Sequence, residues 1–293
     1  TTNELRNLNP GDGQINIFTY EKGKIIDRCV FLKNENNIQI VTSPENDKKV
    51  ADWIRKYIFI EDVSVETLSM DTATVSLFGP QSAAVLNKLF SSDFHQLSEF
   101  HHKRATYHTS PITIFATSEL GVPGFNLLTE TGLIAKLWDD LMKCGAEFGL
   151  RPMGEESFEV LRIENGWPIF GKDFDDTVNP HEAGLLPYID FDKGCYIGQE
   201  VIARLDTYEK VQKYLMGVVL EGDWLPALTV PVFIENKEAG YLTSSTRSLA
   251  LDKNVALAYV RTKAIREQAN VVVKSKTHKT VGELVKLPFL NLI

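Results

Sequence analysis

The segment Lys193–Glu200, which reads K-G-C-Y-I-G-Q-E, is the clearest pattern for chemistry in the sequence. Its cysteine, Cys195, stands two residues after Lys193 and just before a predicted short helix from Gln199 to Leu205. A neighbouring positive charge and a helix N-terminus both favour the thiolate form, so this thiol is a candidate reactive group. A buried thiol that only fills space is the alternative that the pattern leaves open.

The other two cysteines, Cys29 and Cys144, lack such neighbours, and we interpret both as packing residues. Three cysteines at unrelated spacings fit neither a disulfide framework nor a zinc site, so a reducing compartment is expected. The adjacent His101 and His102 would point apart on a regular element, and we expect no metal site. Dinucleotide and P-loop glycine patterns are absent from the sequence.

A second candidate group surrounds the end of a predicted helix from Met153 to Asn165, where Arg162 and Glu164 lie. Four more carboxylates follow in the long irregular loop Gly166–Gly194: Asp173, Asp175, Asp176 and Glu182. An arginine can grip an anionic ligand tail bidentately, and a carboxylate can accept an amine or amide edge. A structural network of ion pairs is the alternative. Asp27, on an otherwise apolar strand, joins the candidates if its side chain faces a cleft.

Length and composition limit the architectures that must position these residues. The chain has 293 residues and a mass of 33.0 kDa, which suits two or three modules. A mean hydropathy of -0.13 and the lack of an apolar run long enough for a bilayer indicate a protein without membrane spans. The net charge of -8 argues against indiscriminate nucleic-acid binding. The acidity is confined to residues 1–205, whereas residues 206–293 carry 12 basic against 9 acidic side chains.

Three rounds of strands followed by a helix fill the first half of the chain. The predicted helices begin after Ser43-Pro44-Glu45, at Gln81 and at Leu133, and Gly145 is the expected C-cap of the third. This order predicts α+β modules with helices packed on antiparallel sheets. After Tyr214 the pattern changes to six short strands: Leu215–Leu220, Val230–Ile234, Tyr241–Ser245, Ala256–Val260, Val271–Lys274 and Val281–Leu287. They predict a small β-barrel or sandwich.

Taken in order, these features resemble the glycine-cleavage T-protein (aminomethyltransferase) superfamily, and most closely its YgfZ-type folate-binding branch. The matching segments are Thr2–Leu5 with Gly11–Gly13, Gly23–Asp27, Leu77–Gln81, Leu161–Gly166 with Gly171, Asp173 and Pro180–Glu182, and Lys193–Glu200 with Arg204. The last of these is similar to the K-G-C-Y-x-G-Q-E signature of the YgfZ-type branch, which T-proteins lack. Lys253–Val260 also resembles the family's barrel segment.

The resemblance implies an α+β fold of two folate-binding modules and a C-terminal β-barrel around a central folate-binding hole. The expected modules are residues 1–45 with 146–205, residues 46–145, and the barrel at residues 206–293. The chain begins inside the family pattern, so we expect its N-terminal strand and helix to be truncated.

The resemblance also implies tetrahydrofolate, or a one-carbon derivative of it, as cofactor. It makes the chain an accessory protein of iron–sulfur cluster assembly or repair, with an indirect link to tRNA modification. The implied partners are iron–sulfur proteins or their assembly factors, in the cytoplasm or, in a eukaryote, the mitochondrial matrix. The implied catalytic residues are Cys195 and Asp27. The implied cofactor-binding residues are Asn126, Arg162, Glu164, Lys193, Tyr196, Gln199 and Arg204.

Two alternative functions remain open. The first is a folate-dependent aminomethyl or one-carbon transferase that uses Asp27 near a folate nitrogen. Two departures count against it: Arg28 replaces the family's second acidic residue, and Asn126 replaces a pterin-binding glutamate. The second is RNA binding through basic residues of the barrel, namely Lys210, Lys213, Arg261, Lys263 and Arg266. Because barrels commonly carry such residues as solvated faces, we expect no direct nucleic-acid binding.

Overall fold

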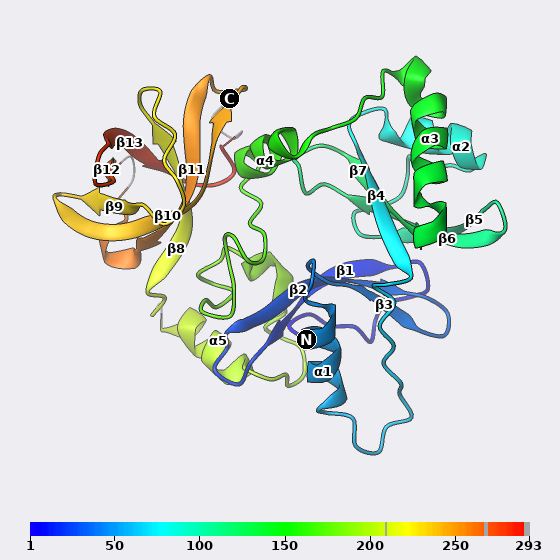
Figure 1. Cartoon of the computed structure of the whole chain (residues 1–293). Helices are drawn as coiled ribbons and strands as arrows, with labels where there is room; N and C mark the ends of the chain where they lie inside the picture. The colour runs from blue at the N-terminus through cyan, green and yellow to red at the C-terminus, as the bar shows by residue number, and fades with distance from the viewer. Residues whose placement is uncertain (209, 267–268, 290–293) are drawn as a thin grey trace. The chain divides into compact units, whose positions relative to one another are not determined.

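The computed structural model describes residues 1–208, 210–266 and 269–289 (Figure 1). Its contacts divide the chain into two units. Unit 1 comprises Thr1–Thr2, Thr19–Ile26 and the chain from Gly154 onward, and unit 2 comprises Asn3–Phe18 and Asp27–Met153. Helices packed on antiparallel sheets, with a closed C-terminal barrel, confirm the predicted α+β fold class. The finer division into three modules stays a prediction.

Unit 2 contains most of a three-stranded sheet in the order β1-β2-β3. Its strands are β1 (Gly13–Thr19), β2 (Ile25–Lys33) and β3 (Ile38–Val41). Strands β2 and β3 are antiparallel, with Val30 opposite Val41. Helix α1 (Asp47–Arg55) follows β3, as predicted, and buries Val50 and Ala51.

The second sheet of unit 2 has four antiparallel strands in the order β4-β7-β6-β5. The strands are β4 (Thr72–Phe78), β5 (His102–Tyr107), β6 (Ser110–Thr117) and β7 (Gly124–Glu130). Helices α2 (Ser82–Phe90) and α3 (Ile134–Gly145) pack on it, and a 3-10 turn, Thr131–Leu133, precedes α3.

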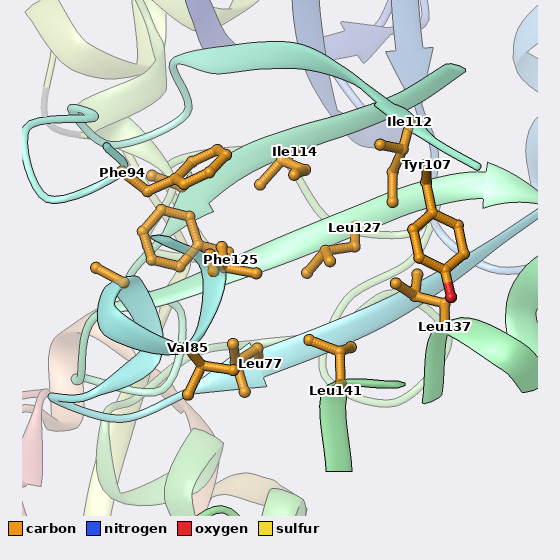
Figure 2. Packing of buried hydrophobic residues seen from close by; sticks show 13 residues of the cluster. Leu77, Val85, Phe94, Tyr107, Ile112, Ile114, Phe125, Leu127, Leu137 and Leu141 are labelled. Carbon is orange, nitrogen blue, oxygen red and sulfur yellow. The ribbon is translucent and has the colours of Figure 1, made fainter. Parts of the chain in front are cut away.

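Alternate residues of these strands build the core of this sheet (Figure 2). Ile112 and Ile114 from β6 and Leu127 from β7 are fully buried. Leu137 and Leu141, four residues apart on one face of α3, point into the same cluster. A period of two on the strands and of nearly four on the helix therefore brings apolar side chains to one layer.

Helix α3 ends at Gly145, close to the predicted end, but the predicted role of Gly145 as C-cap is wrong. Gly145 lies inside the helical run with an ordinary φ of -81°, and a 3-10 turn, Ala146–Phe148, continues from it. The left-handed residue that ends the run is Gly149, with φ of +75°. An added Cβ at Gly145 would meet the Leu150 side chain at 2.4 Å, so this glycine serves close packing.

Unit 1 contains helices α4 (Glu155–Glu164) and α5 (Gln199–Thr207), joined by the long loop that the sequence predicted. Within this loop lie only a 3-10 turn, Leu186–Tyr188, and a bridge between Phe170 and Phe174. No helix among the described residues has the length and apolar character needed to cross a membrane.

The six predicted C-terminal strands are confirmed and close into a barrel of order β10-β11-β8-β13-β12-β9. They are β8 (Lys213–Leu220), β9 (Pro231–Ile234), β10 (Lys237–Ser248), β11 (Lys253–Arg261), β12 (Asn270–Lys274) and β13 (Lys279–Val285). A 3-10 turn, Thr262–Ala264, follows β11. Val218, Val232, Leu242 and Val273 are among the fully buried residues that fill the barrel.

Candidate functional site

The candidate residues belong to both units. Asp27 and Asn126 lie in unit 2, whereas Arg162, Glu164 and the residues of the Lys193–Arg204 region lie in unit 1. We describe the two groups separately.

Gly198 sets the start of α5 and thereby the shape of the cysteine segment. Its φ is +84°, a backbone conformation that glycine adopts most easily. A Cβ atom at this position would lie 2.5 Å from the Tyr20 carbonyl oxygen. The neighbouring Ile197 carbonyl accepts a hydrogen bond of 2.5 Å from the Thr19 hydroxyl. The glycine therefore allows the segment to approach the turn between β1 and β2, and the helix predicted from Gln199 is confirmed.

Gln199 closes the loop that carries Cys195. Its side-chain oxygen accepts a hydrogen bond from the Tyr196 amide at 3.3 Å, and its nitrogen donates to the Lys193 carbonyl at 3.5 Å. Cys195, between these two anchors, has an exposed side chain. The Lys193 ammonium donates to the Thr1 carbonyl at 2.8 Å and lies 5.6 Å from the centre of the Tyr196 ring. The packing alternative for Cys195 therefore does not describe this conformation.

Two further candidate side chains of this region, Tyr196 and Arg204, differ in exposure. The Tyr196 hydroxyl is buried and has no hydrogen-bond partner among the described residues. Burial, aided by the charge of Asp190, raises the pKa of Tyr196 to about 12, so the phenol stays protonated at neutral pH. Arg204 lies in the last turn of α5 with its side chain exposed. The binding roles of Lys193, Tyr196, Gln199 and Arg204 stay predictions.

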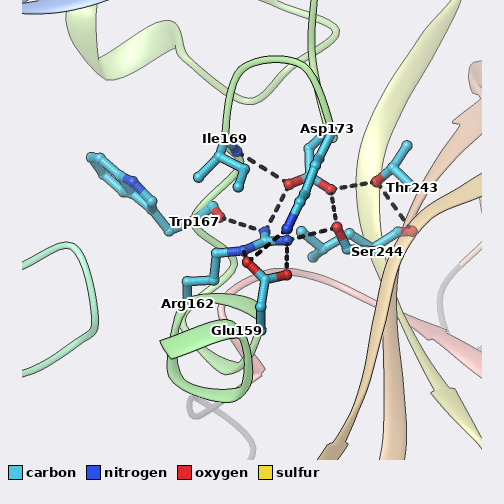
Figure 3. A network of polar contacts seen from close by, with 9 residues as sticks. Glu159, Arg162, Trp167, Ile169, Asp173, Thr243 and Ser244 are labelled. Atoms are coloured by element: carbon cyan, nitrogen blue, oxygen red, sulfur yellow. Dashed lines mark hydrogen bonds and ion pairs between the residues drawn. The ribbon is translucent and has the colours of Figure 1, made fainter. Parts of the chain in front are cut away.

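Arg162 lies at the centre of a buried polar network on α4 (Figure 3). Its guanidinium donates to both oxygens of Glu159, at 2.8 and 2.6 Å. It also donates to Asp173 at 2.7 Å, to the Ser244 hydroxyl at 2.8 Å and to the Trp167 carbonyl at 3.2 Å. The side chains of Arg162 and Asp173 are both 0 % exposed.

Asp173 completes this network by joining three segments. One oxygen accepts hydrogen bonds from the hydroxyls of Thr243 and Ser244, each at 2.7 Å. The other accepts from Arg162 and from the Ile169 amide at 3.1 Å. Burial disfavours the guanidinium charge, but the two carboxylates outweigh it and raise the pKa of Arg162. These contacts correspond to the structural ion-pair alternative, and a ligand-binding role for Arg162 stays a prediction that requires some of them to open.

Glu164, two residues further along α4, contacts the end of β10. Its carboxylate accepts hydrogen bonds from the Ser248 hydroxyl at 2.5 Å and from the Ala250 amide at 3.3 Å. Only 4 % of the residue is exposed. Helix α4 therefore contacts the barrel through both Arg162 and Glu164, and the predicted ligand contact of Glu164 is not tested by this arrangement.

In unit 2, Asp27 is fully buried on β2. Its carboxylate accepts hydrogen bonds from the Ser43 amide at 2.9 Å, the Ser43 hydroxyl at 2.6 Å, the Arg28 amide at 2.8 Å and the Cys29 thiol at 3.5 Å. Burial, followed by the charge of Asp27, raises the pKa of Cys29. Asp27 thus ties β2 to Ser43, in the segment between β3 and α1, and its side chain does not face an open cleft here.

Asn126 lies on β7, opposite Ser76 of β4 and Phe115 of β6. Its side-chain oxygen accepts a hydrogen bond of 2.5 Å from the Ser76 hydroxyl, and the residue is 8 % exposed. The side chain is therefore held on one face of the four-stranded sheet. Its contact with a pterin stays a prediction.

Comparison with known proteins identifies the family. The model of the GCVT N-terminal domain matches residues 1–193, and that of the glycine cleavage T-protein C-terminal barrel domain matches residues 213–291. The chain belongs to the glycine-cleavage T-protein family. The resemblance at the superfamily level is thereby confirmed.

Relatives in this T-protein family carry the name aminomethyltransferase. The protein from Chlorobium limicola is 28 % identical over 295 residues, which cover 99 % of this chain and 81 % of that protein. The protein from Caldanaerobacter subterraneus subsp. tengcongensis is 28 % identical over 284 residues, which cover 96 % of this chain and 76 % of that protein. These names do not distinguish the YgfZ-type branch, which stays a prediction.

A solved T-protein structure shares the fold. The glycine cleavage system aminomethyltransferase T from Bartonella henselae aligns with a TM-score of 0.86 at 19 % identity. The alignment covers 97 % of this chain and 77 % of that one. At this level of identity, the likeness supports the fold of the family member and nothing finer.

The sequence reasoning did not single out the buried histidine of this T-protein chain. His181 is 2 % exposed, and neither ring nitrogen has a hydrogen-bond partner among the described residues. An Asp206 carboxylate oxygen lies 3.6 Å from its Nε2, which is too long for a hydrogen bond but close enough for attraction of a charged ring. The position between Pro180 and Glu182 in a family motif was the only sequence signal. No cluster of three metal-ligating side chains was found in the described part of the chain.

Two buried histidines are expected to make this T-protein less stable in acid. Burial lowers the pKa of His181, and burial followed by the charge of Arg104 lowers the pKa of His102. Above the unfolded value of about 6.5, both rings are neutral in both states and stability is complete. Below it the unfolded chain takes up protons first, so the free energy of unfolding falls until the folded pKa values are reached. Urea titrations between pH 7.5 and 5 should show this fall, at most about 1.4 kcal/mol per pH unit for each proton. His181→Gln should reduce the fall, and an unchanged slope would count against the assignment.

Proposed function

We propose that this protein binds tetrahydrofolate and acts on a one-carbon unit as a folate-dependent aminomethyltransferase-type protein. The observation that carries the proposal is the match of both T-protein domains, over residues 1–193 and 213–291. The aminomethyltransferase relatives support it, because the similarity extends over 96–99 % of this chain in the two proteins named above. Tetrahydrofolate, the cofactor that the resemblance implied, agrees with this membership.

The buried carboxylate of Asp27 sets a condition on catalysis. All its described contacts are to donors of its own unit, and Ser43 supplies two of them. A transfer that uses Asp27 at a folate nitrogen therefore requires the Ser43 contacts to open, or requires Asp27 to act by holding its neighbours in position. Asn126, bonded to Ser76, offers an amide rather than a charged carboxylate to a pterin.

Tetrahydrofolate is expected to raise the melting temperature, because a ligand that binds only the native state stabilises it. At one hundred times the dissociation constant the gain is about 2.7 kcal/mol, which corresponds to a rise of several degrees. The transfer step is tested by supplying tetrahydrofolate with an aminomethyl or methylated-amine donor and measuring methylene-tetrahydrofolate. Stabilisation without product would refute the transferase and leave folate binding. No stabilisation would refute both.

A second function is favoured by one observation, the K-G-C-Y-x-G-Q-E segment with its exposed Cys195. It is the accessory role in iron–sulfur cluster assembly or repair, with tetrahydrofolate as ligand and iron–sulfur proteins or their assembly factors as partners. An effect on tRNA modification would then be indirect, through iron–sulfur enzymes. The cytoplasm, or the mitochondrial matrix in a eukaryote, is the compartment of this proposal.

Replacing Cys195 by alanine is expected to abolish support of iron–sulfur enzymes while leaving the free energy of unfolding within about 0.5 kcal/mol, because the side chain is exposed. The measurement is the activity of an iron–sulfur enzyme in cells that depend on the variant. Cys144→Ala is the matched control, since Cys144 is half-buried in α3 and outside the motif. Full activity of Cys195→Ala would reject a role of the thiol.

A further inference from the structure

A cavity of about 410 Å³ lies at one end of the barrel, apart from the residues described above. It is lined by neighbouring parts of β9, β10 and β11, because the start of β10 pairs with the end of β9 and lies beside the end of β11. Ile234 and Ala239 are buried there, and Ala264 is half-buried. Ile234 and Ala239 pack into the barrel core, so the half-buried Ala264 is the apolar residue on which an uncharged part of a ligand can lie.

The charged side chains around this cavity are mostly basic. Lys237, Arg261, Lys263 and Arg266 contribute four positive charges, and Glu235 and Glu238 contribute two negative ones. Among the residues that the structure describes, the cavity lining is thus net positive by two charges, on a chain whose net charge is -8. A positive region on an acidic protein attracts anions selectively to that place.

Most of these cations have no carboxylate partner among the described residues. Arg261 donates to the Glu238 carbonyl at 2.9 Å and lies 3.8 Å from the Glu238 carboxylate, so the charges of these two side chains offset each other. In the described part of the chain, Arg266 donates to two backbone carbonyls, those of Lys263 and Ile265. In residues 1–208, 210–266 and 269–289, neither the Lys237 nor the Lys263 ammonium has a hydrogen-bond or ion-pair partner. Three cations are therefore available to one ligand.

This grouping refines the basic patch expected from the sequence. Arg261, Lys263 and Arg266 share the cavity, but Lys213 does not line it. The Lys213 ammonium donates to the Tyr241 hydroxyl at 2.9 Å and lies 4.5 Å from the centre of the Tyr259 ring. The cations gather in one concave place instead of following a long surface, which suits a small ligand better than a nucleic-acid strand.

We propose that this cavity binds a phosphorylated organic molecule of about nucleotide size. Its phosphate oxygens would accept charge-assisted hydrogen bonds from Lys237, Lys263 and Arg266, which are stronger than neutral ones. Its organic part would lie against Ala264. Cavities of several hundred Å³ suit such ligands. This site is separate from the proposed function, since tetrahydrofolate carries no phosphate.

Calorimetric titration with ATP, tripolyphosphate and a single-stranded RNA decamer tests this proposal on the full chain. ATP and tripolyphosphate have the same number of phosphates, so tighter binding of ATP reports the apolar surface. We expect ATP to bind most tightly and to bind equally well with tetrahydrofolate present. Lys237→Gln with Lys263→Gln should weaken ATP binding by about tenfold or more, the factor that corresponds to 1.4 kcal/mol.

The matched control is Lys253→Gln with Lys274→Gln, which removes the same charge from the barrel. Lys253 begins β11 and Lys274 ends β12, away from the cavity lining, so ATP affinity should change by less than about twofold. Equal weakening in both double variants, equal binding of ATP and tripolyphosphate, or no binding of ATP would overturn the proposal. Binding of the RNA decamer alone would overturn it in favour of a nucleic-acid surface, and its affinity would then fall steeply with salt.

Discussion

Replacing Arg162 by methionine is expected to lower the free energy of unfolding by about 3–5 kcal/mol, because it leaves the buried Asp173 carboxylate without its cation. Asp173 is 0 % exposed at its side chain and bonds Arg162 at 2.7 Å. Methionine has a similar length and fills most of the same space, so the loss reports the charge and its hydrogen bonds. Urea unfolding of the variant at neutral pH measures it.

Lys172→Met is the matched control for this variant. The Lys172 ammonium lies 3.3 Å from the same Glu159 that Arg162 contacts, but its side chain is 40 % exposed. Solvent screens such a pair, so its removal should cost less than about 1 kcal/mol. Equal losses of unfolding free energy in the two variants would show that the buried contacts of Arg162 contribute no more to stability than an exposed ion pair. The structural interpretation of Arg162 would then be wrong.

The sequence predicted that Arg162 and Asp173 belong to one polar group. It could not predict which residues of the barrel they contact. Ser244 is 82 residues beyond Arg162 in the sequence. A serine in a strand gives no sign of a contact with a residue so distant along the chain. The same holds for Glu164, whose partner Ser248 is 84 residues distant. Such contacts are set by tertiary packing, whereas the patterns read from a sequence are local.

Secondary structure could be predicted from the sequence where the local pattern of residues was strong. The six barrel strands are short runs rich in apolar and β-branched residues, and all six are present. The sequence also predicted a short helix from Gln199, and the structure confirms this start of α5. Gly145 was misjudged because a glycine near a helix end has two uses, left-handed backbone and close packing, and the sequence does not separate them.

Replacing Gly198 by alanine is expected to lower the free energy of unfolding by about 3 kcal/mol. A left-handed backbone costs an alanine about 1–2 kcal/mol, and crowding of a packed position adds about 1–3 kcal/mol. The crowding is specific: the new Cβ would lie 2.5 Å from the Tyr20 carbonyl oxygen and 3.0 Å from the Thr19 hydroxyl. Relief of this contact requires the Cys195 loop to move from the turn between β1 and β2.

Gly184→Ala separates the two contributions, because Gly184 has a similar φ of +71° but open space where the Cβ would stand. Its expected loss is the backbone cost alone, about 1–2 kcal/mol. Hydrogen exchange supplies the second readout: amides of the Lys193–Glu200 segment should exchange faster in Gly198→Ala and at the wild-type rate in Gly184→Ala. If both variants lose the same stability and protection, contact with Tyr20 does not hold the segment in place. The position of Cys195 would then depend on other contacts of the loop, among them the two hydrogen bonds of Gln199 that span it from Lys193 to Tyr196.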